Sequence, residues 1–189
     1  MTAVVAPARP AIRSSAERVA IACTAASAAI GAAGVVFLAG MFTSFAIGAR
    51  SQGLVLGGIN DVLVLVSYAL AAPAVIVLRG RVRPSAPLAT DAATVVGLVS
   101  IGAIVMLQAA LVRGVLTFEQ QIGPVSIAFL AFAVWLVAIG RLGSRSGLLP
   151  GGVRMGLLGA TYVGYPVWAA WAARRLGRAI IDSTESSPA

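Results

Sequence analysis

Long runs of apolar residues, separated by short polar segments, fill almost the whole of this 189-residue chain. An α-helix rises 1.5 Å per residue, so about 20 apolar residues cross the roughly 30 Å hydrocarbon core of a bilayer. Each long run therefore predicts a membrane-spanning helix. The expected fold class is all-α, an integral membrane bundle of five helices with short loops, although the chain length allows four to six. The predicted spans cover residues 15–48, 54–78, 92–112, 122–139 and 153–173.

Polar segments flank the predicted bundle, which covers residues 19–173. Residues 1–18 contain prolines and arginines, which favour an extended tail, and we place this tail in the cytoplasm. Ser14 or Ser15 is the expected N-cap of the first helix. Residues 174–189 end in a Ser-rich stretch that predicts a polar, disordered tail. The N-terminus also resembles a signal peptide, but its apolar run far exceeds the roughly 7–15 residues of such a segment, so we expect an uncleaved first span.

A helix start signal precedes the fourth predicted span. Thr117 and Gln120 have the spacing of a capping box, in which each side chain accepts a hydrogen bond from the other residue's backbone N–H. Gly123 and Pro124 follow, and the proline is expected to kink or restart this helix.

The composition confirms a membrane environment and excludes several chemistries. Hydrophobic residues make up 59% of the chain and charged residues 11%, and the mean hydropathy is +0.97. The only cysteine is Cys23 and there is no histidine, so we expect no metal or haem cofactor. Lysine is absent as well, which excludes Schiff-base cofactors such as retinal and pyridoxal phosphate.

The net charge of +8 comes from arginines that stand in small groups between the apolar runs. They are not gathered on one soluble face, which argues against nucleic acid as a partner. Positive charge is retained on the cytoplasmic side of a membrane protein. The arginines of residues 1–18, 79–84 and 141–154 would share one side of a five-span bundle, with Arg50 and Arg113 on the other. This pattern predicts a multi-pass membrane protein with a cytoplasmic N-terminus. The use of arginine in place of lysine, with many alanine, glycine and valine residues, indicates a GC-rich bacterial genome, and we therefore expect the bacterial inner membrane.

The last three arginines conflict with five spans, because Arg174, Arg175 and Arg178 would then lie outside. One alternative is that the charge rule fails at the C-terminus. The other is that the number of spans is wrong, with residues 147–173 broken into a re-entrant pair by their glycines and Pro166.

Small residues recur every fourth position along the fifth predicted span, a spacing that permits close approach of another helix. This helix-packing ridge consists of Gly152, Gly156, Ala160 and Gly164. A shorter pair, Gly53 and Gly57, opens the second span. In a chain so rich in glycine and alanine, we favour packing within the bundle over self-association.

Ionisable side chains are nearly absent from the interior of the predicted spans, and Asp61 is the exception. A carboxylate in the membrane is costly and usually marks a partner or a function. The alternative is that the span starts later and Asp61 is an ordinary acid of the first helical turn. In a five-span bundle it would share an outward-facing polar pocket, with Arg113 as counter-ion to Asp61 or Glu119. The candidate pocket residues are Asn60, Asp61, Gln108, Arg113, Glu119, Gln120, Tyr162 and Tyr165.

Residues 129–165 include the segment Ser146-Gly147-Leu148-Leu149-Pro150, which follows an apolar run and precedes a Gly-rich one. In this arrangement the chain resembles a family of small, uncharacterised bacterial multi-pass membrane proteins of an actinobacterial type. The resemblance implies a helical membrane fold, commonly with six spans. It implies no activity and no catalytic residue.

The sequence therefore favours a non-catalytic accessory or structural subunit that packs against itself or a larger membrane complex. The alternative is a small transporter or channel with the outer pocket around Asp61. An enzyme is least favoured, since few acids, bases or nucleophiles are available. The expected partners are the lipid bilayer, a membrane protein or a second copy, and anionic lipid headgroups at the arginine groups.

Overall fold

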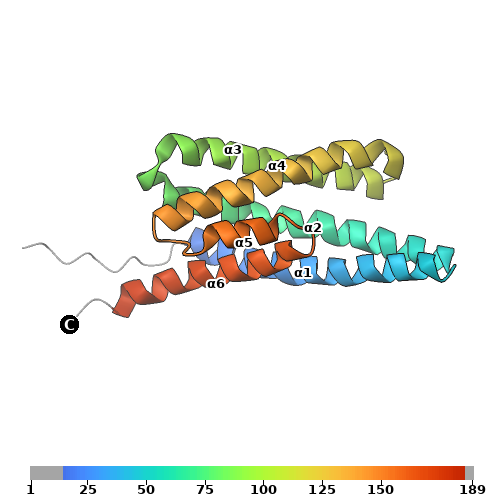
Figure 1. Ribbon diagram of the computed structural model, residues 1–189, viewed down its shortest axis with the longest axis horizontal. Coiled ribbons are helices and arrows are strands. Elements are labelled where there is room, and N and C mark those ends of the chain that lie inside the picture. Colours follow the sequence, from blue (N-terminus) through green and yellow to red (C-terminus); the bar gives the residue numbers. More distant parts are fainter. Residues whose placement is uncertain (1–14, 186–189) are drawn as a thin grey trace, which may run out of the picture.

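A computed structural model describes the backbone of residues 15–185 and the side chains as far as Arg178. The described chain is all-helical (Figure 1). Its α-helices are α1 (Ser15–Ala46), α2 (Arg50–Val82), α3 (Pro87–Val112), α4 (Phe118–Arg145), α5 (Gly152–Gly159) and α6 (Gly164–Glu185), and a 3-10 turn, η1 (Arg83–Ser85), follows α2.

The helices form a closed ring. Each helix packs against the next one along the chain, and α6 packs against α1, while α2 and α4 meet across the interior mainly through the rings of Tyr68, Phe129 and Phe132. The helices α1 to α4 run as two long hairpins, and α5 with α6 forms a third, shorter one between α4 and α1 (Figure 1). The turn between α1 and α2 uses Gly48 at φ 79°, a conformation that a residue with a side chain rarely adopts.

Four of the described helices are long and apolar enough to cross a membrane, namely α1, α2 with η1, α3 and α4. Ser15, the first residue that the structure describes, already lies in α1, and the other expected N-cap, Ser14, lies outside the described residues. The capping box is confirmed, because Gln120 Oε1 accepts a hydrogen bond from Thr117 N at 2.9 Å and Thr117 Oγ1 accepts one from Gln120 N. Pro124 lies inside α4 and does not restart it, which corrects one of the two outcomes expected there.

The predicted single helix over residues 153–173 is wrong. The chain breaks after Gly159, so α5 has only 8 residues and reaches about 12 Å, less than half of a bilayer core. After the turn, α6 runs back toward the end where α5 began (Figure 1). The alternative of a broken pair is therefore the one that describes the path of this part of the chain. The break follows from Gly164, whose missing side chain lets its backbone approach the Leu158 carbonyl.

The predicted disordered tail from residue 174 is also wrong over its described part, because α6 continues through Glu185. Residues 186–189 and 1–14 lie outside the described part. The sequence predicts that the apolar run ends at residue 173, but α6 continues past it, where arginine and alanine are good helix formers.

The return of α6 resolves the conflict over the arginines. The start of α1 and the ends of α2, α4 and α6 lie at one end of the bundle, which we call the arginine-rich end (Figure 1). Among the arginines of the described residues, only Arg50 and Arg113 lie at the opposite end, Arg50 as the first residue of α2 and Arg113 in the turn after α3.

Ion pairs connect the helices at the arginine-rich end. Arg81 pairs with Glu17 of α1 at 2.6 Å, and Asp91 of α3 pairs with Arg79 at 2.7 Å and Arg83 at 3.2 Å. The N-cap position of α3 is Ala86, and the Asp91 side chain joins α3 to α2. These pairs set the relative level of α1, α2 and α3.

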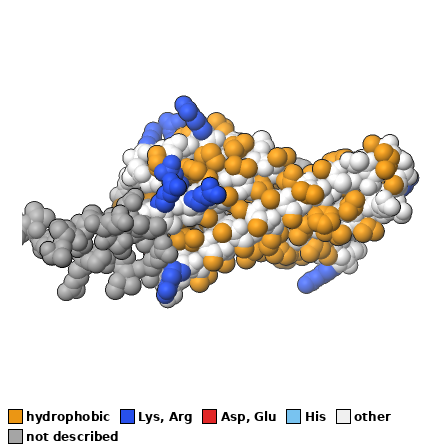
Figure 2. All heavy atoms as spheres, turned by 90° about the horizontal axis from the view of Figure 1, so that it is seen from below, with side chains coloured by type: hydrophobic (Ala, Val, Ile, Leu, Met, Phe, Trp, Pro, Cys, Tyr) orange, Lys and Arg blue, Asp and Glu red, His pale blue; other side chains and the backbone are white. Residues whose placement is uncertain are grey.

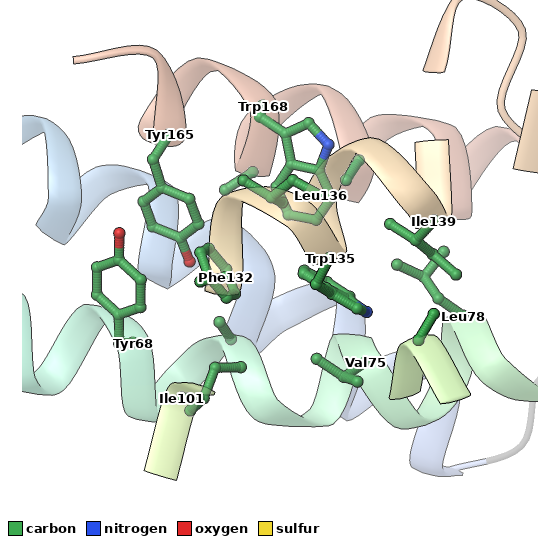
Figure 3. Packing of buried hydrophobic residues seen from close by; sticks show 14 of the residues in the cluster. Tyr68, Val75, Leu78, Ile101, Phe132, Trp135, Leu136, Ile139, Tyr165 and Trp168 are labelled. Carbon is green, nitrogen blue, oxygen red and sulfur yellow. The ribbon is translucent and has the colours of Figure 1, made fainter. Parts of the chain in front are cut away.

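The core lies in the half of the bundle near the arginine-rich end, where all three hairpins are present. Its largest buried side chains include Trp135, Phe132 and Leu136 of α4, Trp168 of α6 and Leu78 of α2 (Figure 3). Trp135 lies against Gly97 of α3, where an added Cβ would meet the indole at 2.8 Å. Close packing of this kind is the main stabilising contribution between helices in lipid, since lipid chains are as apolar as the side chains.

Candidate functional site

The turn between α5 and α6, residues 160–163, lies partway along the bundle (Figure 1). It contains Tyr162, and Tyr165 follows in the first turn of α6. Thr161 holds the turn: its hydroxyl donates to Leu158 O at 2.8 Å and accepts from Gly164 N at 2.9 Å. Before the turn, Gly159 packs directly against the Trp168 side chain, which would meet an added Cβ at 2.7 Å. The local sequence therefore fixes where Tyr162 and Tyr165 enter the bundle.

Tyr165 takes part in a buried hydroxyl cluster with Ser27 of α1 and Ser67 of α2. Ser27 Oγ lies 2.7 Å from the Tyr165 hydroxyl and 3.2 Å from Ser67 Oγ. Each serine also donates to the other's backbone carbonyl, at 2.8 and 2.9 Å. The hydroxyl cluster thus joins three helices through groups that satisfy one another, as a membrane interior requires.

Tyr162 makes the second polar contact of the turn. Its hydroxyl donates to Asn60 Oδ1 of α2 at 2.7 Å. The neighbouring Asp61 is half-buried, and within the described residues it forms no hydrogen bond or ion pair. Asp61 therefore stands as an unpaired carboxyl beside the contact that fixes Tyr162.

Aromatic rings surround these polar groups on the side of the arginine-rich end. Tyr68 stacks on Tyr165, with ring centroids 4.8 Å apart, and meets the edges of Phe129 and Phe132 (Figure 3). Phe132 and Trp168 continue the cluster toward Trp135. The rings fill the interior below the turn.

Small cavities lie on either side of the tyrosines. One of about 10 Å³ lies between α1, α2 and α6, next to Gly31 and Ser67, and has the size of a single water molecule. The other, of about 180 Å³, lies between Phe129 of α4 and the α5–α6 turn. Both are smaller than the roughly 300–1,000 Å³ of a site for a drug-sized ligand.

The structure brings together only half of the predicted polar pocket. Asn60, Asp61, Tyr162 and Tyr165 gather at the α5–α6 turn. The other four lie where α3 meets α4, with Gln108 buried and Arg113, Glu119 and Gln120 exposed. Within the described residues Arg113 pairs with neither Asp61 nor Glu119, so the predicted counter-ion is not in place. Gln120 is occupied by the capping box.

The predicted packing ridge is likewise divided. Gly152 lies against the backbone of Gly140, and Gly156 against that of Leu136, so that α5 approaches α4 within the bundle. Ala160 is exposed in the turn, and Gly164 begins α6. Gly159 lies against Trp168 of α6 and not against α4, and the four-residue spacing of the predicted ridge does not include it.

Sequence reasoning also missed Ser27 and Ser67. The available signal was that each is a hydroxyl residue inside an apolar run, where a polar side chain needs a partner. Several other buried polar atoms have no protein partner within the described residues: Thr90 Oγ1, Gln108 Oε1, Gln121 Nε2, Trp135 Nε1 and Trp168 Nε1. These atoms come from different parts of the bundle and do not form one site.

The described residues offer no group of three His, Cys, Asp or Glu side chains that could hold a metal ion. Chemically, the arrangement at the turn can donate and accept hydrogen bonds and can place one carboxylate beside a tyrosine.

No protein-family model, no curated protein and no solved structure matches this chain. Its function therefore has to be inferred from the geometry of the chain itself.

Proposed function

We propose that this chain is a non-catalytic accessory subunit of a bacterial inner-membrane complex, which packs against a partner membrane protein or a second copy of itself. The observation that carries the proposal is the end of the α1–α2 hairpin, residues 41–57, which extends past the α3–α4 hairpin (Figure 1). We call this part the α1–α2 projection.

The length of the projection follows from the ion pairs at the other end. Arg79 of α2 and Asp91 of α3 are paired and therefore lie at one level. From that level α2 extends about eight residues further than α3, which corresponds to roughly 12 Å. The turn from α3 to α4 contains Arg113 and Glu119, charged residues suited to the membrane surface. The projection would then stand beyond that surface.

The surface of the projection is unsuited to water. Phe42, Ile47 and Leu54 are 61%, 74% and 65% exposed. An apolar patch that protrudes from a membrane into water favours contact with another protein. The interior of the projection is closely packed, since Phe45 covers Gly53 and Met41 covers Gly57. It can therefore present these side chains on a rigid support.

The arginines support the proposed orientation. With α6 returning to the arginine-rich end, the group at residues 174–178 joins those at 79–83 and 141–154. This charge distribution favours the cytoplasm for both ends of the chain, and the outer side for the projection.

Photo-crosslinking in native membranes tests the proposal. In a Cys23→Ser background, Ile47→Cys and Leu54→Cys each carry a benzophenone maleimide, and Val99→Cys, exposed on α3, is the matched control. We expect discrete protein adducts from positions 47 and 54 and none from position 99. A mass of two chains would identify a second copy, and another mass a different partner. Absence of a discrete adduct at both projection sites would overturn the proposal.

A small transporter or channel is the second candidate. The observation that favours it is the broken pair α5–α6 beside the unpaired Asp61, since transporters often bind substrates where discontinuous helices meet. Cation or proton flux in proteoliposomes that disappears in Asp61→Asn, but persists in the surface variant Glu119→Gln, would support this candidate. Equal flux in empty liposomes and in those containing the protein would reject it.

A further inference from the structure

A groove of about 600 Å³ runs along the surface of the bundle over α6, beside α1. On the α1 side it is lined by Ala25, Ala28, Ala29 and Ala32, which recur on one face of that helix. Alanine side chains are short, so they leave a channel beside the larger side chains of α6. Ala29 and Ala32 are exposed, and the groove therefore opens toward the surrounding lipid.

The groove has the depth of one lipid leaflet. Along α6 it extends from Pro166, in the first turn, to Arg174 near the arginine-rich end. These positions are about 12 Å apart along the helix axis, close to half of the roughly 30 Å hydrocarbon core. The reason is the re-entrant path of the chain, because α6 begins only partway through the bundle.

One end of the groove is cationic and the rest is apolar. Arg174 is the only charged residue among those that line it, and Trp171 lies one turn before Arg174. On this face, with α1 and α6 toward the viewer, basic side chains gather near the end where α6 finishes, and no acidic side chain of the described residues is visible (Figure 2). A guanidinium forms strong, charge-assisted hydrogen bonds with phosphate, and tryptophan favours the headgroup level.

We propose that this groove binds one acyl chain of an anionic phospholipid, with the lipid phosphate at Arg174. The site goes beyond the proposed function and does not depend on the α1–α2 projection. A membrane-spanning partner helix fits less well, because it would need a contact surface across both leaflets, and the groove ends at Pro166.

Native mass spectrometry of the full chain tests the site. The protein is delipidated in detergent and then offered phosphatidylglycerol or phosphatidylcholine with identical acyl chains. We expect one tightly retained phosphatidylglycerol per chain and at least about fivefold weaker retention of phosphatidylcholine, the factor that one charge near the surface contributes. Arg174→Gln should remove this preference. Arg178→Gln is the matched control, since Arg178 is exposed at the same end but does not line the groove.

A second pair of variants tests the apolar part. Ala29→Phe fills the groove from an exposed position and should abolish retention of both lipids, whereas Ala69→Phe, exposed on α2 away from the groove, should leave it unchanged. Equal retention of the two lipids by the parent chain would overturn the site. Unchanged retention of phosphatidylglycerol in Arg174→Gln or in Ala29→Phe would also overturn the site. A dimer mass that disappears in Ala29→Phe would overturn it as well, because a second copy would then occupy the groove.

Discussion

The two halves of the bundle use apolar residues in opposite ways. Toward the arginine-rich end, three hairpins enclose an aromatic core in which Trp135 and Trp168 are each 1% exposed. Toward the other end only α1 to α4 remain, and large side chains such as Phe42 and Ile47 point outward. All of these residues contribute to the same high hydropathy. The comparison shows that in a membrane chain hydropathy indicates where a helix can lie, while packing depends on which helices are present at that depth.

The largest expected effect distinguishes a buried ring from an exposed side chain on the same helix. Trp135→Ala should lower the free energy of unfolding by about 3–5 kcal/mol, because it leaves a cavity among Phe132, Trp168 and Gly97. Val134→Ala, at an exposed position, should change it by less than about 0.5 kcal/mol. Unfolding in mixed micelles with increasing dodecyl sulfate measures both. Similar losses of unfolding free energy in the two variants would contradict the placement of Trp135 in the interior and of Val134 on the surface.

The second prediction concerns the contact that holds the short helix. Gly156→Leu should destabilise the fold by about 1–3 kcal/mol or more, because the new side chain would meet the Leu136 backbone of α4, which cannot move aside. Gly102→Leu on α3, where a Cβ meets nothing within 4 Å, is the control. The same unfolding assay applies, with Asp61→Asn measured in parallel and expected to remain fully folded. A stable Gly156→Leu variant together with an unfolded Asp61→Asn variant would show that folding depends on Asp61 and not on the contact between α5 and α4 at Gly156.

A smaller effect should separate the two tyrosines of the turn. Tyr165→Phe removes the hydroxyl that lies 2.7 Å from Ser27 Oγ and should cost about 0.6–1.7 kcal/mol, the range found for hydrogen bonds between membrane helices. Tyr162→Phe should cost less, because Tyr162 is only half-buried and Asn60 can turn toward water. Trypsin cleavage after the arginines of α6 would report local opening of α5–α6 in each variant. Greater opening in Tyr162→Phe would place the main anchor at Asn60 instead.

The smallest effect is expected at the surface of the arginine-rich end. Asp91→Asn removes the pairing with Arg79 and Arg83, whose side chains are half exposed. Its cost should be at most about 1 kcal/mol and should shrink in high salt, since exposed ion pairs are screened. Thermal unfolding at low and high salt measures this. A large, salt-independent loss would show that the pair is part of the core.

The sequence predicts the long helices well, because continuous apolar runs of this length are typical of membrane-spanning helices and of few other structures. The capping box at Thr117 is a local signal and is confirmed. The path of residues 152–185 could not be read as reliably, because its apolar length alone suits one crossing helix. The break depends on contacts that the local sequence does not display, such as the backbone of Gly164 against Leu158. The charges of Arg174, Arg175 and Arg178 were the better guide.

The candidate site illustrates the same limit. Asn60, Asp61, Tyr162 and Tyr165 were grouped by assuming one level in the membrane, and they do lie around one turn. Arg113 and Glu119 were added by the same assumption, yet they belong to the surface turn of the other hairpin. Ser27 and Ser67 escaped notice because serine is common in membrane helices, and only the path of α6 brings Tyr165 to them.

The return of α6 to the arginine-rich end is the central feature, and cysteine labelling in intact cells tests it most directly. In a Cys23→Ser background, single cysteines are placed by Gly114→Cys in the α3–α4 turn, Ser146→Cys after α4 and Arg178→Cys near the end of α6. We predict that a membrane-impermeant maleimide labels position 114 from one side of the membrane, and positions 146 and 178 only from the other. Labelling of position 178 from the same side as position 114 would show that α6 crosses the membrane and would contradict the re-entrant fold.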